Sequence, residues 1–109
     1  MLDAYRKAEP KAADTIGMLV NTHHNGDHCY GNECCEGAEI IAHKLAAEAM
    51  AHEPPEMLVG FLEAAPDLGD LGAYLTKCFG VFDFKGVTPT LPTTTFEGSL
   101  TRKVGNKDV

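Results

Sequence analysis

The chain has 109 residues, with nine Lys and Arg against 16 Asp and Glu, and a formal net charge of −7. This acidic balance opposes binding to a phosphate backbone, so we expect no nucleic-acid partner. Hydrophobic residues make up 44% of the chain, yet no apolar run approaches the roughly 18 residues of a membrane span, and the start lacks a signal-peptide pattern. We therefore expect a cytoplasmic globular protein without membrane contact, long enough for one small domain.

The first elements lead into a polar loop. Met1–Glu9 has the pattern of a short amphipathic helix, which Pro10 should close because proline interrupts helical hydrogen bonding. The apolar run Ile16–Val20 predicts a buried strand that starts at Asp14-Thr15. Residues directly after such a strand lie at an open end of the sheet, where functional loops are common.

The loop Asn21–Asn32 places three histidines and one carboxylate within six residues. Zinc and similar borderline metals take imidazole nitrogens and carboxylate oxygens, and several ligands can come from one tight loop. His23, Asp27 and His28 supply such donors. The alternative is a polar loop whose histidines only cap strand ends; the density of donors favours the metal site.

Residues 22–28 resemble the His-x-His-x-Asp-His signature of the metallo-β-lactamase superfamily of binuclear metallo-hydrolases. His23 takes the first histidine position, Asp27 the aspartate and His28 the last histidine, whereas Asn25 stands where the second histidine normally sits. His24 occupies a spacer position and should point away. The resemblance implies four local metal ligands: His23, Asn25, Asp27 and His28.

The resemblance also implies the metal and the reaction. Because the amide oxygen of Asn25 is a harder and weaker ligand than imidazole, we expect one or two Zn²⁺ ions, with Fe or Mn as other candidates. The implied function is a metal-dependent hydrolase that acts on a small-molecule substrate, with Asp27 as catalytic ligand. An activated water would attack an ester, thioester, lactam or phospho- or sulfo-ester.

The resemblance further implies an α/β fold that is part of a metallo-β-lactamase-like αββα sandwich. Cys29–Asn32, Phe79–Phe84 and Pro92–Gly98 are similar to segments of the same superfamily. On this basis residues 1–109 form a single partial domain. Residues 1–52 hold the metal-loop βαβ portion, 53–84 a helical lid-like insert, and 85–109 strands with a C-terminal β-hairpin.

The elements after the loop are predicted from local patterns. We expect one helical turn over Cys29–Cys35, ended by Gly37, and a buried parallel strand over the apolar run Glu39–Ala42. Lys44–His52 is rich in Ala, Leu, Glu and Met and should be a helix that the following two prolines end.

Two further helices and a hairpin complete the chain. Pro55 can open a helix whose apolar stripe we interpret as packing on the body rather than as a ligand groove; it comprises Met57, Leu58, Phe61, Leu62 and Ala65. Asp67 or Asp70 should cap the next helix, and Gly80 should end it. Residues 88–96 are β-rich, and 99–109 predict a hairpin turning at 105–108.

An alternative function remains open. Only His43 and His52 follow the loop, and we expect surface or element-end roles for both, so the ligand set is incomplete in this chain. The chain could be an inactive fragment, or a metal-binding module that another chain completes. Exposed sheet edges would then allow a homo-oligomer.

Overall fold

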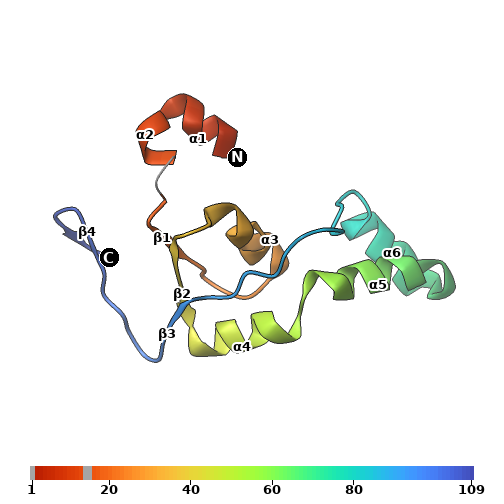
Figure 1. Ribbon diagram of the computed structural model, residues 1–109. Helices are drawn as coiled ribbons and strands as arrows, with labels where there is room; N and C mark the ends of the chain where they lie inside the picture. Colours follow the sequence, from red (N-terminus) through yellow and green to blue (C-terminus); the bar gives the residue numbers. More distant parts are fainter. Residues whose placement is uncertain (1, 14–15) are drawn as a thin grey trace.

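The computed structural model describes residues 2–13 and 16–109, so the expected strand start at Asp14-Thr15 lies outside the described residues. The fold is mixed α/β (Figure 1). In chain order the elements are α1 (Leu2–Ala8), α2 (Pro10–Ala13), β1 (Met18–Val20), α3 (Gly26–Cys29), the 3-10 helix η1 (Tyr30–Cys35), β2 (Glu39–His43), α4 (Lys44–His52), α5 (Pro55–Ala64), η2 (Ala65–Asp67), α6 (Gly69–Phe79), β3 (Thr94–Phe96), β4 (Lys103–Val104) and β5 (Lys107–Asp108).

A three-stranded parallel sheet in the order β1-β2-β3 organises the chain. Leu19 pairs with Ile40 on one side of β2, and Ala42 pairs with Thr95 on the other. The central strand is the most buried element, with Ile41 2% exposed. The predicted buried parallel strand is therefore confirmed, and it extends one residue farther, to His43.

The prediction of a buried first strand is wrong in part. The strand covers Met18–Val20 rather than the whole apolar run, and Val20 is 58% exposed. The physical reason is its place at the edge of the sheet, where β2 is its one neighbour among the described strands. An apolar run alone does not distinguish an edge strand from a central one.

The helices after β2 follow the sequence pattern closely. The predicted helix Lys44–His52 is confirmed as α4, and α5 begins at Pro55 as expected. Gly80 ends α6 and donates its N–H to the carbonyl of Thr76. The cap prediction is wrong: Leu68 stands at the N-cap of α6, and no side chain caps that end.

The segments at both ends of the chain depart in detail from the predictions. Pro10 closes α1 as expected, but it also opens the short helix α2, because proline suits a first helical position. The turn expected after the loop is longer, since α3 continues directly into η1. Residues 80–93 contain no strand, so of the β-rich 88–96 only β3 is regular.

A C-terminal hairpin is present as predicted, but its turn is shorter than the expected 105–108, because Lys107 and Asp108 belong to strand β5 and only Gly105 and Asn106 form the turn. Antiparallel strands β4 and β5 pair Lys103 with Asp108, and Arg102 and Val109 exchange two backbone hydrogen bonds of 2.8 Å. Gly105 lies at φ +62°, a conformation that a tight two-residue turn requires and glycine adopts without strain.

The hydrophobic core is small and lies around β2. Its buried hydrophobic residues are Cys29, Ala38, Ile40, Ile41, Ala42 and Met50, whereas Ala65 is buried separately in η2, against α6. The chain exposes 7875 Å², whereas a compact protein of this mass exposes about 5,900 Å². Its radius of gyration is 16.7 Å, against about 13 Å for a compact domain of this length. The excess surface is consistent with α5 and α6 extending away from the sheet (Figure 1).

Gly72 is expected to be essential to the junction of α6 with η2. A β-carbon at this buried position would overlap the carbonyl of Ala65, so Gly72→Ala forces the two elements apart. We expect the free energy of unfolding to fall by about 1–3 kcal/mol. Gly60 in α5 has open space around a β-carbon, so Gly60→Ala should raise stability by about 0.5–1 kcal/mol. Urea unfolding followed by circular dichroism measures both variants. If Gly72→Ala were as stable as Gly60→Ala, the close packing of Gly72 against Ala65 would be contradicted.

Candidate functional site

The polar loop lies at the carboxyl end of β1. We call residues 21–32 the histidine loop; it leaves the strand at Asn21, turns through residues 22–25 and continues as α3 and η1. Asn21 is still held to the sheet, because its backbone N–H donates to the carbonyl of Ile41 at 2.9 Å. The loop therefore starts from a fixed point beside the central strand.

A buried pair of asparagines fixes the two ends of the histidine loop. Asn21 and Asn32 are 5% and 2% exposed, and each side-chain amide donates to the other's amide oxygen, at 2.9 and 3.0 Å. Asn21 also donates to the carbonyl of His28, and Asn32 to the carbonyl of Thr90. Sequence reasoning missed this pair; the only available signal was that an asparagine flanks the loop at each end.

The pair satisfies polar atoms that would otherwise be costly to bury. It also ties the loop to the segment before β3, since Thr90 lies 58 positions after Asn32. The backbone of the histidine loop is therefore held in one arrangement at both ends. A loop fixed in this way can present its side chains without a large loss of conformational entropy on binding.

Three of the four predicted ligands lie together. The imidazole rings of His23 and His28 lie next to each other, with centroids 3.9 Å apart and ring planes tilted by 46°. Oδ2 of Asp27 is 3.2 Å from Nε2 of His28. The two side chains therefore contact each other directly, and the His23 ring lies beside them.

His24 and Asn25 do not join this group. His24 turns toward Glu53, with Nε2 3.5 Å from a carboxylate oxygen, and its carbonyl accepts a hydrogen bond from the thiol of Cys29. Asn25, the fourth predicted ligand, is the N-cap residue of α3, and its carbonyl accepts the N–H of His28 at 2.9 Å. The Asn25 side chain is exposed and makes no capping hydrogen bond.

Over residues 2–13 and 16–109, no group of three or more His, Cys, Asp and Glu side chains is arranged to hold a metal ion. The later histidines occupy element ends, as predicted. His43 caps α4 by accepting the N–H of Leu45 at 3.2 Å, and His52 is exposed at the end of the same helix. The loop thus offers an adjacent donor pair and a third ring rather than a closed ligand cage.

Cys29 adjoins the donor pair but does not resemble a ligand. The residue is buried, and that burial, followed by the negative charges of Asp27 and Glu53, raises the pKa of its thiol. The thiol donates to the carbonyl of His24 at 3.1 Å. A protonated thiol is a poor metal ligand and a poor nucleophile, so Cys29 acts here as a packed residue.

A groove of about 800 Å³ adjoins the histidine loop. Its floor includes residues 25–27 and Tyr30; Met57, Leu58 and Phe61 of α5 form one wall, and the segment 79–87 forms the other. The interpretation of the α5 stripe as core is wrong at Met57 and Phe61, which are 41% and 47% exposed. The reason is that α5 packs against α6 and η2, which leaves part of its apolar face open to the groove.

Gly26 shapes the floor of the groove. A β-carbon at this position would overlap the ring of Tyr30, so glycine allows that ring to lie against the start of α3. Tyr30 in turn contacts Phe84 edge to face, with ring centroids 6.2 Å apart. The histidine loop and the segment before β3 therefore meet through aromatic rings at this end of the groove.

Comparisons with protein-family models, with curated proteins and with solved structures find no match to this chain. Among the described helices, none has the length and apolar character needed to cross a bilayer. What the site can bind therefore follows from its own donors, which are two imidazoles and one carboxylate next to an apolar groove.

Proposed function

We propose that this chain is the metal-loop portion of a metal-dependent hydrolase of the metallo-β-lactamase superfamily, which acts on a small-molecule substrate. The observation that carries the proposal is the contact between Asp27 and His28, with the His23 ring against it, at the end of a strand. The mixed α/β fold with a parallel sheet is compatible with part of an αββα sandwich.

The donor set suits Zn²⁺, one or two ions, with Fe or Mn as other candidates. A metal bound there would supply a water of lowered pKa, and therefore a hydroxide nucleophile near neutral pH. His23 and His28 would donate imidazole nitrogens, and Asp27 would donate a carboxylate oxygen and orient the attacking water. Asn25 would contribute only its weaker amide oxygen, for which its exposed side chain is free to turn.

The groove supports a role for the helical segment 53–84 as a lid-like wall. Asp27 lines the groove as well as contacting His28, so a molecule held between α5 and the segment 79–87 would lie next to the metal donors. The groove's volume of about 800 Å³ is within the range of roughly 300–1,000 Å³ that small-molecule sites have.

All four cysteines are free, which is typical of a reducing compartment. A cytoplasmic location is therefore part of the proposal. Two of these cysteines, Cys34 and Cys35, are adjacent in η1 and remain unpaired. Adjacent cysteines rarely reach disulfide geometry.

A second candidate function is an inactive fragment or a metal-binding module that another chain completes. It is favoured by the open donor set among residues 2–13 and 16–109 and by the two sheet edges, β1 and β3. Unpaired strand edges are templates for pairing with a second chain. A molar mass that rises with protein concentration would support completion by a second copy. A strict monomer that binds no metal would exclude completion by a second copy and leave the inactive fragment.

Turnover of a panel of esters, thioesters, lactams and phosphoesters tests the hydrolase. We expect hydrolysis of at least one class in the presence of Zn²⁺, Mn²⁺ or Fe²⁺, abolished by a chelator. Asp27→Asn should lower the rate of this hydrolysis by at least about 100-fold, because the substitution removes a charged ligand and the group that orients water. Asp108→Asn, an equal charge change on the distant hairpin, serves as the control. Activity that survives the chelator or Asp27→Asn would contradict the proposal.

A further inference from the structure

We infer that the groove beside the histidine loop binds an organic ammonium ion that carries an aromatic or bulky apolar body. As a statement about the substrate, this inference rests on the proposed function; as a statement about binding, it needs no metal. It commits to a cationic small molecule because the groove combines aromatic walls with carboxylates at its rim.

The aromatic wall comes from the segment before β3 and from the loop. Phe82 and Phe84 lie with ring centroids 6.0 Å apart, and Tyr30 stands edge to face against Phe84. Phe82 is 60% exposed, so its side chain is accessible to a ligand, whereas Tyr30 and Phe84 are half-buried. Aromatic rings that line one cavity attract quaternary and other ammonium groups, because the face of each ring carries negative partial charge.

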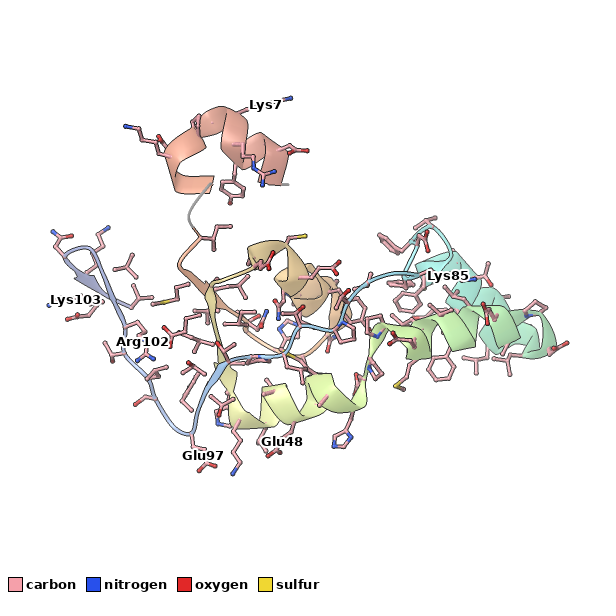
Figure 2. All side chains as sticks on the ribbon, in the orientation of Figure 1. Lys7, Glu48, Lys85, Glu97, Arg102 and Lys103 are labelled. Carbon is pink, nitrogen blue, oxygen red and sulfur yellow. The ribbon has the colours of Figure 1, made fainter. Side chains whose placement is uncertain are left out.

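The charges that line the groove are of one sign. Asp27, Glu53 and Asp83 contribute carboxylates, and within the described part of the chain no Lys or Arg lines it. The Asp83 carboxylate is held in place, since it accepts the backbone N–H of Lys85 at 3.0 Å. The Lys85 ammonium pairs with Glu63 at 3.0 Å (Figure 2 labels Lys85). An anion in the groove would therefore be repelled, and a cation attracted.

Two of these carboxylates contact imidazoles. His24 contacts Glu53 and His28 contacts Asp27, so each of these two carboxylates already has an imidazole neighbour. The Asp27, His28 and Glu53 side chains remain 78%, 46% and 56% exposed. Asp83 has no such imidazole among its described contacts and is the strongest candidate for direct pairing with the ammonium group.

The test is a calorimetric titration of the full chain, treated with chelator, against three probes of similar body. These are phenylbutyl-trimethylammonium, phenylbutanol and phenylbutyrate. We expect the ammonium probe to bind about fivefold more tightly than the alcohol, and phenylbutyrate to bind most weakly. Equal affinities, tightest binding of phenylbutyrate, or no binding of any probe would overturn the inference.

Variants locate the charge effect. Asp83→Asn should reduce the preference for ammonium over alcohol to about twofold or less, and Phe82→Ala should weaken the ammonium probe by about fivefold. If Asp83→Asn binds phenylbutanol with the affinity of the native chain, the groove is intact in the variant. Glu48→Gln is the control, because it removes the same charge from the exposed face of α4 (Figure 2). A loss in Glu48→Gln equal to that in Asp83→Asn would overturn the inference, since the attraction would then be to net charge alone.

The same assays separate this inference from the proposed function. Ammonium binding without metal-dependent turnover of any substrate would contradict the hydrolase and leave the ligand class standing. Metal-dependent turnover that is faster for anionic esters than for matched choline-type esters would overturn the ligand class and leave the hydrolase standing. A groove filled by a second copy, seen as a dimer that binds no probe, would also overturn it.

Discussion

Asn32→Ala is expected to lower the free energy of unfolding by about 3–4 kcal/mol, the largest stability effect of any single change at the site. The substitution removes the hydrogen bonds to Asn21 and to the carbonyl of Thr90. It leaves the Asn21 amide, 5% exposed, with donor and acceptor groups short of partners in a place that water barely reaches. Urea unfolding followed by circular dichroism measures the change.

Asn25→Ala provides the matched control for this stability prediction. Asn25 is in the same loop, but its side chain is exposed and makes no capping hydrogen bond, so the loss should stay within about 0.5 kcal/mol. If Asn32→Ala were as stable as Asn25→Ala, the amide pair would not be what holds the histidine loop. Proteolysis within the loop should rise in Asn32→Ala, since the side-chain link between the two loop ends is lost, although the backbone bond from Asn21 to Ile41 remains.

His28→Ala is expected to weaken zinc binding by about 100-fold or more. Loss of an outer partner of a ligand alone costs about 10–100-fold, and here a donor itself is lost. The change also removes the ring that contacts both Asp27 and His23. Competition against a chromophoric zinc chelator measures the dissociation constant, with circular dichroism to verify the fold.

Two variants of neighbouring residues sharpen this prediction. His24→Ala should change zinc affinity by no more than about twofold, because the His24 ring turns to Glu53 instead of to the donor pair. Asn25→His should strengthen binding, because imidazole replaces a weaker amide donor at the start of α3. A loss in His24→Ala equal to that in His28→Ala would contradict the assignment of the donors.

Local patterns predicted the elements whose ends carry strong signals. Pro55 opens α5 and Gly80 ends α6, because proline and glycine act within one or two residues of their own position. The run at β2 is apolar on both faces, and the strand is buried between two neighbours. The donors His23, Asp27 and His28 are close in sequence, so their proximity in space needs little tertiary information.

Features that depend on distant contacts could not be predicted in this way. Whether Met57 and Phe61 face a core or a groove depends on where α5 packs, and nothing in their spacing decides that. The bond from Asn32 to Thr90 joins residues far apart in the chain. The exposure of Val20 follows from its place on an edge strand, which only the assembled sheet defines.

Metal content tests the central claim most directly. The native chain and Asp27→Ala would be purified in zinc-supplemented buffer, freed of loosely bound ions and measured by elemental analysis. The contact of Asp27 with His28, with His23 beside it, predicts about one zinc ion per native chain and none in the variant. No zinc in the native chain, or equal zinc in both, would contradict a metal site in the histidine loop.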